Sequence, residues 1–200
     1  MSSSSPGGAA STTGSTSSIA REAIGGAVAG AAAYLLGFLS VYVTQSGRIE
    51  EGLSGLNFLA ELFGNDPIST WQVSGWMFYN AHFVETVFPA LFGGTQSRNL
   101  LMEAEGAGFL FLVPPVLLLV GGLVAGRVAG ADTPLDGARS GALVAAGYLP
   151  LALVGTFLFR YAVGDGSVIP DVVTAVLLAG AVYPAAFGAL GGAGSSLLSD

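Results

Sequence analysis

The stretch GAGFLFLVPPVLLLVGGLVAG, residues 106–126, contains no charged side chain and is the clearest guide to the fold. A helix rises ~1.5 Å per residue, so ~20 apolar residues cover the ~30 Å hydrocarbon core of a bilayer. Three further stretches of 20 or more residues share this property: 23–47, 140–159 and 172–199. In a soluble chain, polar residues would alternate with the apolar residues within such stretches, because one side of each helix would face water. The pattern predicts an integral membrane protein.

The composition points the same way and excludes several kinds of site. Hydrophobic residues make up 52% of the 200 residues and charged residues only 10%, which is typical of membrane proteins. Cysteine is absent, so disulfides and thiolate metal sites are excluded. The net charge is −7, with arginine as the only basic residue type, and we interpret this as adaptation to high salt in a haloarchaeal source. The sequence contains no cluster of basic residues, so nucleic acid is not an expected partner.

The apolar stretches predict an all-α membrane protein with a single four-helix transmembrane domain over residues 19–194. Residues 1–18 are almost entirely Ser, Thr, Gly and Ala, cannot bury enough apolar surface to fold, and are expected to be a disordered tail. A short C-terminal tail covers 195–200. The expected spans are about 20–44, 106–128, 139–162 and 170–193.

Glycines recur on the expected spans at spacings that favour helix packing. Small residues four apart let two membrane helices approach closely. The candidate packing residues are Gly26, Gly30, Gly122, Gly126, Gly188 and Gly192.

Arginine positions give an expected orientation in the cell membrane. Arg21 precedes the first span, and the short loop 127–139 carries Arg127 and Arg139. The charged residues of the long loop 45–105 are mostly acidic. Because short cytoplasmic loops are enriched in basic residues, we expect both termini in the cytoplasm and the long loop outside.

The segment STWQVSGWMFYNAHFVETVFPALF, residues 69–92, differs from the rest of the chain. Ser69 followed by Gln72 is a capping box that begins a helix. The apolar and polar positions then separate onto two faces, which predicts an amphipathic helix over about 70–92. We expect it to lie at the membrane interface or across the outer ends of the bundle. A fifth span is the alternative, and it would invert the topology of everything after it.

This segment carries a candidate functional polar cluster of Tyr79, Asn80, His82 and Glu85. His82 is the only histidine, and Glu85 would follow it by one helical turn. Such a pair suits a proton relay; the simpler interpretation is a polar face wetted by solvent. Asn80 interrupts the apolar face and should hydrogen-bond to a neighbouring helix. Two residues make neither a metal site nor a triad, so no catalytic residue, metal or cofactor is expected.

The run WMFYNAHFVE, residues 76–85, placed between a first span and three later glycine-rich spans, resembles an uncharacterised family of small haloarchaeal multi-pass membrane proteins. The resemblance rests on a short aromatic signature and the four-span layout. It implies no activity, substrate or cofactor, and it implies that the extramembrane helix belongs to the fold. The residues that carry the resemblance are Trp76, Phe78, Tyr79, Asn80, Ala81, His82 and Phe83.

Two classes of function stay open from the sequence, and a third ranks last. A non-enzymatic structural or accessory subunit fits the near absence of ionisable residues inside the spans, because transporters usually retain some there. Its partners would be the lipid bilayer and either a second copy or another membrane protein. A small transporter or channel for an ion or small solute is the alternative, motivated by prolines in three spans. An intramembrane enzyme ranks last, because a single histidine without cysteine leaves few catalytic combinations.

Overall fold

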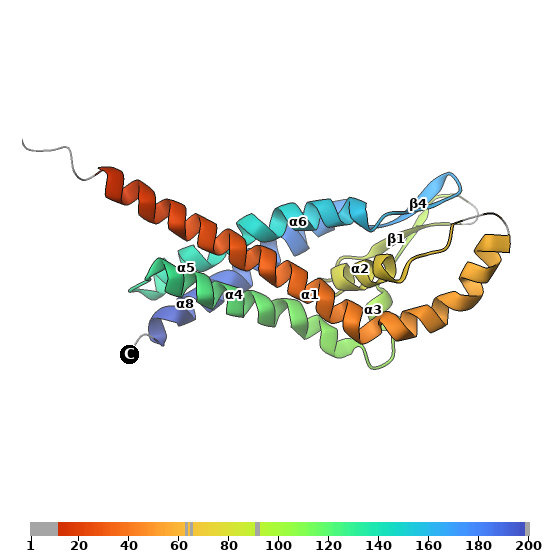
Figure 1. The fold of residues 1–200 in the computed structure, drawn as a ribbon, viewed down its shortest axis with the longest axis horizontal. Coiled ribbons are helices and arrows are strands. Elements are labelled where there is room, and N and C mark those ends of the chain that lie inside the picture. The colour runs from red at the N-terminus through yellow and green to blue at the C-terminus, as the bar shows by residue number, and fades with distance from the viewer. Residues whose placement is uncertain (1–11, 63, 65, 91–92, 199–200) are drawn as a thin grey trace, which may run out of the picture.

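The computed structural model describes residues 12–198 except 63, 65, 91 and 92, and it is an elongated helical bundle with a small sheet at one end (Figure 1). Residues 1–11 of the predicted tail lie outside the described residues, and the first helix begins at Thr12. The elements are α1 (Thr12–Leu62), α2 (Thr70–Asn80), β1 (Thr86–Pro89), β2 (Thr95–Arg98), α3 (Leu100–Glu103), the 3₁₀ turn η1 (Gly108–Leu112), α4 (Val113–Ala129), α5 (Pro134–Ala142), α6 (Val144–Leu158), β3 (Tyr161–Val163), β4 (Gly166–Pro170), α7 (Val172–Thr174), the π-helical segment η2 (Ala175–Val182) and α8 (Tyr183–Leu197).

Within the described residues, four helical segments are long and apolar enough to cross a membrane, which agrees with the expected number. They are Ala20–Leu62, Gly108–Ala129, Pro134–Leu158 and Val172–Leu197. The third begins five residues before the expected 139, because Thr133 caps it. The Thr133 hydroxyl oxygen accepts a hydrogen bond from the Asp136 amide at 3.2 Å, and a proline follows the cap, where its missing N–H costs nothing.

Helix α1 is longer than the sequence indicated. The expected span ended near residue 44, but the helix continues to Leu62 and runs on past α2 and α3 (Figure 1). Its last part, residues 49–62, is called the α1 arm below. The arm is held on its inner side by Asn57, whose amide group bonds both the N–H and the C=O of Ile68, at 2.8 and 3.0 Å. Much of the expected long loop is therefore helix.

Glycine backbones form the helix crossings. A Cβ atom on Gly30 would overlap the carbonyl oxygen of Val144, and one on Gly122 would overlap that of Gly188. Close approach of this kind is how membrane helices pack without bulky apolar side chains. All six candidate packing glycines lie at such crossings: Gly26 and Gly30 against α6 and the residue before it, Gly122 and Gly126 against α8, and Gly188 and Gly192 against α5.

A four-stranded antiparallel sheet at one end of the bundle corrects the all-α prediction. The strand order is β2-β1-β4-β3, with Thr86 opposite Arg98 and Val87 opposite Ile169. Strands β3 and β4 form a hairpin that turns at Gly164 and Asp165, and Gly164 has a φ of 54°. A two-residue turn with a glycine at positive φ is a hairpin signal, and the VGDG motif carried it.

The helix expected over about 70–92 ends at Asn80. Phe83 adopts a φ of 60°, and the Val84 amide bonds back to the Tyr79 carbonyl at 3.2 Å. This 6→1 bond closes a Schellman motif, whose left-handed residue is usually glycine. Here it is a phenylalanine, so the sequence carried no stop signal. The chain then turns into β1.

Candidate functional site

Helix α2 enters the end of the bundle between α1 and α6 and points its C-terminal end inward. Its contacts run from the two residues after α6 back along that helix. Gln72 Nε2 donates to the Arg160 carbonyl at 2.9 Å, and Trp76 Nε1 donates to the Phe159 carbonyl at 2.7 Å. His82 reaches Tyr148, which lies 158 − 148 = 10 residues before the end of α6, or ~15 Å of helix. The predicted amphipathic helix therefore packs into the end of the bundle, where its residues from Ser74 to Asn80 are buried.

His82 is fully buried at the inner end of this insertion. Its Nδ1 lies 2.9 Å from the Phe78 carbonyl oxygen. Because a carbonyl only accepts, Nδ1 carries the hydrogen, and Nε2 accepts from the Tyr148 hydroxyl at 2.7 Å. Burial lowers the pKa of His82 to about 4, and the bond to Phe78 opposes that shift only in part. The ring is neutral at physiological pH.

Tyr79, near the end of α2, forms a second buried hydrogen-bonded group. Its hydroxyl donates to the Ala152 carbonyl and accepts from the Tyr34 hydroxyl at 3.2 Å. A Cβ on Gly155 would overlap the Tyr34 oxygen, so the glycine makes room for both phenols. Helices α1, α2 and α6 are thereby joined through side chains far apart in the sequence.

Asn80 fixes the turn that follows α2. It is fully buried, and its Nδ2 donates to the Val84 carbonyl at 2.7 Å and to Thr86 Oγ1 at 3.2 Å. Its Oδ1 accepts from the amide of Leu100, the first residue of α3, at 2.9 Å. A buried amide with all these partners specifies one backbone path.

The four residues of the predicted cluster do not come together. Tyr79, Asn80 and His82 are buried, whereas Glu85 is exposed and contributes its backbone carbonyl to the Asp171 amide at 2.9 Å. His82 and Glu85 were expected to lie one turn apart on the same helix. That helix ends at Asn80, before either residue, so the expected pairing does not form. His82 pairs with a tyrosine of α6 instead, which no local spacing could indicate.

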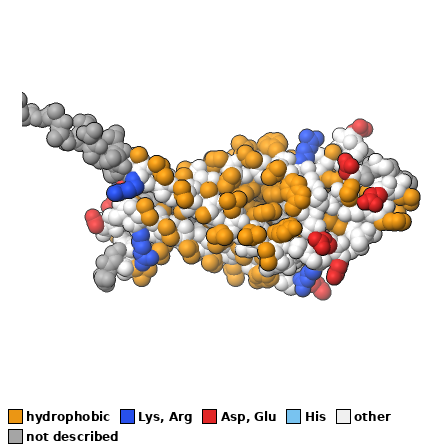
Figure 2. Space-filling view, in the orientation of Figure 1, with side chains coloured by type: hydrophobic (Ala, Val, Ile, Leu, Met, Phe, Trp, Pro, Cys, Tyr) orange, Lys and Arg blue, Asp and Glu red, His pale blue; other side chains and the backbone are white. Residues whose placement is uncertain are grey.

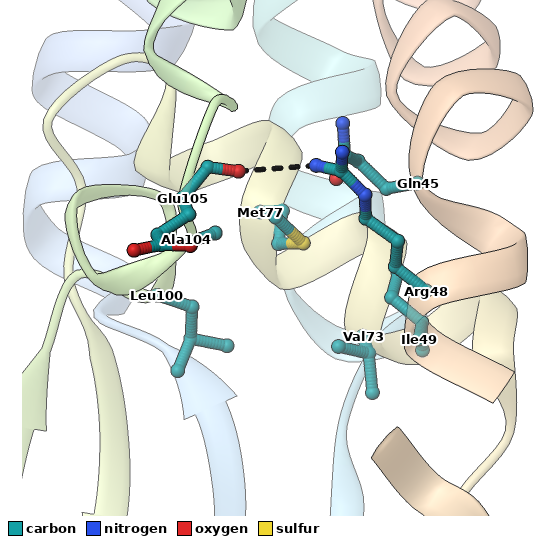
Figure 3. A pocket seen from close by; sticks show the side chains of 8 residues that line it. All are labelled: Gln45, Arg48, Ile49, Val73, Met77, Leu100, Ala104 and Glu105. Carbon is teal, nitrogen blue, oxygen red and sulfur yellow. Dashed lines mark hydrogen bonds between the residues drawn. The ribbon is translucent and has the colours of Figure 1, made fainter. Parts of the chain in front are cut away.

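A cavity of about 570 Å³ opens beside α2, at the level where α1 leaves the bundle (Figure 3). Its polar lining comes from Gln45, Arg48 and Glu105. One Arg48 N–H donates to the Glu105 backbone carbonyl at 3.0 Å, and the Glu105 carboxylate points away from the guanidinium in Figure 3. The apolar lining comes from Ile49, Val73, Met77, Leu100 and Ala104. One mouth thus offers a cationic group beside an apolar wall.

Sequence reasoning missed Tyr34, Tyr148, Gln45 and Arg48 as site residues. Each lies on an apolar helix or at its end. The partners of Tyr34, Tyr148 and Arg48 are distant in the sequence, and Gln45 lines a cavity shared with α2 and α3. The sequence signal at Gln45 was an amide inside the uncharged stretch 23–47, and the structure buries it. Among the described residues, no three or more histidines, cysteines or carboxylates gather in a way that could hold a metal ion.

Comparison with known proteins gives a family and nothing further. No curated protein matches the chain, and no solved structure does. A family model matches residues 5–199, nearly the whole chain, including helix α2, the buried tyrosines and all the residues that line the cavity. The chain therefore belongs to the family of unknown function DUF7978.

Proposed function

We propose that the protein is a non-enzymatic integral membrane protein that crosses the cell membrane four times and serves as an accessory subunit of a larger assembly. The surface of the protein supports the proposed membrane crossing. An apolar band lies between two groups of basic side chains, and most visible acidic side chains lie beyond one of them (Figure 2). Apolar surface of this kind is stable against lipid, and arginines at its edges reach the headgroups.

The α1 arm supports the proposed role as an accessory subunit. Arg21 and Arg48 lie 48 − 21 = 27 residues apart, ~40 Å of helix, which is enough to cross the ~30 Å hydrocarbon core. The arm lies beyond Arg48, yet four of its large apolar side chains are at least half exposed. They are Leu56 (58%), Phe58 (67%), Leu59 (50%) and Leu62 (68%). Exposed apolar residues clustered outside the lipid mark a protein interaction surface.

The partner that fits this surface has an apolar centre and a basic rim. Glu50, Glu51 and Glu61 are exposed on the same arm and would meet cationic side chains across the interface. A second copy fits less well, because a symmetric pairing would bring the same carboxylates together. The proposal is therefore a complex with a different membrane protein.

Double substitution of the arm tests this proposal. Phe58→Ser with Leu59→Ser is expected to abolish a defined complex seen by native mass in mild detergent, because these two side chains supply much of the apolar centre. Leu135→Ser, which removes an exposed leucine at the start of α5 at the other end of the bundle, is the matched control and should retain the complex. A monomer or a homodimer as the only wild-type species would contradict the proposal.

A small transporter or channel is the second candidate, and one observation favours it. Four buried side chains form two hydrogen-bonded pairs inside the bundle, Tyr34 with Tyr79 and His82 with Tyr148, and buried polar groups of this kind occur in proton pathways. Their hydrogen bonds end on the Phe78 and Ala152 carbonyls rather than leading onward, which favours a structural role. Proton or solute flux in vesicles that His82→Ala abolishes would replace the leading proposal with this one.

The positions of the arginines support the proposed orientation in the membrane. Both termini would face the cytoplasm, since Arg127 and Arg139 lie in a short loop at their end of the bundle. The α1 arm and the sheet would then face outward. The net charge of −7 supports a salt-adapted, haloarchaeal source.

A further inference from the structure

We propose that the cavity between α1, α2 and α3 binds one phospholipid, with the phosphate at Arg48 and the start of its chains against Met77 and Leu100. The proposal rests on the four-span placement proposed above, but not on the accessory role. It assigns a lipid to an open cavity of about 570 Å³.

The polar side of the cavity fits a phosphate. Arg48 uses one N–H on the Glu105 backbone carbonyl, and in the described part of the chain it has no ion pair with a carboxylate. The other guanidinium N–H groups are free to bond, and a guanidinium matches two phosphate oxygens at once. Gln45 lies one turn before Arg48 and is only 3% exposed. Its Nε2 makes a long hydrogen bond of 3.5 Å to Thr44 Oγ1, so its amide is a second donor for the same headgroup.

The apolar side of the cavity fits the glycerol-proximal part of a lipid chain. Val73 and Met77 of α2 face Leu100 and Ala104 across the opening (Figure 3). A free phosphate would leave this apolar wall in contact with water, which costs free energy in proportion to its area. A molecule that joins a phosphate to hydrocarbon satisfies both sides at once.

The position of the cavity makes a bilayer lipid the source. Arg48 marks the end of the apolar part of α1, where headgroup phosphates lie in a bilayer. A second, smaller groove of about 260 Å³ follows on the outer surface, between α1 and α4, and it is lined by Ser40, Leu112, Val113, Val116 and Leu117. It lies further along α1 toward the middle of the apolar band, in the direction that a lipid chain would take.

Three probes test the site on the purified full-length protein in non-ionic detergent. Dioleoyl phosphatidylglycerol carries phosphate and chains, dioleoylglycerol carries chains alone, and glycerol phosphate carries phosphate alone. Native mass spectrometry should show one phosphatidylglycerol bound in preference to further copies, with a raised melting temperature. Equal effects from dioleoylglycerol or from glycerol phosphate would overturn the proposal.

Two variants locate the binding. Arg48→Gln should weaken phosphatidylglycerol binding about tenfold, the loss expected for a charge-assisted bond. Ala104→Leu keeps the charge but fills the cavity, and it should also weaken binding. Arg98→Gln removes an exposed arginine at the same end of the molecule and is the matched control. Equal weakening by Arg98→Gln and Arg48→Gln, or unchanged binding in both test variants, would overturn the assignment. A partner complex that survives loss of lipid binding separates this result from the accessory proposal.

Discussion

Replacing Gly30 with alanine is expected to destabilise the protein by about 3 kcal/mol, although alanine is the better helix former. The new methyl group would overlap the Val144 carbonyl oxygen and crowd the Tyr148 amide. Backbone atoms cannot rotate away as a side chain can, so α1 and α6 would have to separate. That separation would also pull Tyr34 away from Tyr79, which joins the same helices.

Gly47→Ala is the matched control in the same helix. Nothing lies within 4 Å of the position that its Cβ would take, so the change should stabilise α1 by up to about 1 kcal/mol through helix propensity. Thermal unfolding in detergent, followed by circular dichroism, should therefore move in opposite directions for the two variants. Equal melting temperatures would contradict the close α1–α6 crossing.

Acidification is expected to destabilise the protein by about 3 kcal/mol between pH 6.5 and pH 4 through His82 alone. The unfolded histidine has a pKa near 6.5, whereas burial lowers the folded pKa to about 4. The unfolded state therefore binds more protons in this window, so stability is greatest above pH 6.5 and falls as the pH falls to 4. The described groups that face the ring are the Phe78 carbonyl and the rings of Phe78, Tyr148 and Tyr183, and none of them supplies a compensating negative charge.

The measurement is the melting temperature across this pH range for the wild type and for His82→Gln. Glutamine keeps an amide that can bond Tyr148 and removes the titrating ring. The variant should be less stable than the wild type at pH 7.5, and the gap should shrink toward pH 4. A constant gap between the two proteins would mean that His82 is not held neutral by burial.

Hydropathy alone indicated the membrane-like part of this fold, for a clear physical reason. Lipid-facing helices must be apolar along ~20 residues, and that requirement is visible in any single stretch such as 106–126. This requirement fixes the number of long apolar helices, and the part of the chain that the structure describes has four. Their ends were less accurate, because caps such as Thr133 compete with hydropathy at the boundary.

The inserted helix shows what the sequence could not reveal. An amphipathic pattern reports which face avoids water, and it does not distinguish a headgroup region from the inside of a bundle. Tyr79 and His82 looked solvent-facing because their partners, Tyr34 and Tyr148, lie 45 and 66 residues away. The early end of α2 was hidden because Phe83 takes a backbone conformation that usually requires glycine.

Cysteine labelling from each side of the membrane tests the central claim most directly, since the chain has no native cysteine. The three informative variants are Gly55→Cys on the α1 arm, Thr95→Cys on β2 and Asp132→Cys in the loop before α5, all at exposed positions. The account has the chain cross the membrane four times, with α2 entering and leaving the bundle on one side. Positions 55 and 95 should therefore label from the same side of the membrane, and position 132 from the opposite side. Labelling of 95 together with 132, or of all three from one side, would contradict the account.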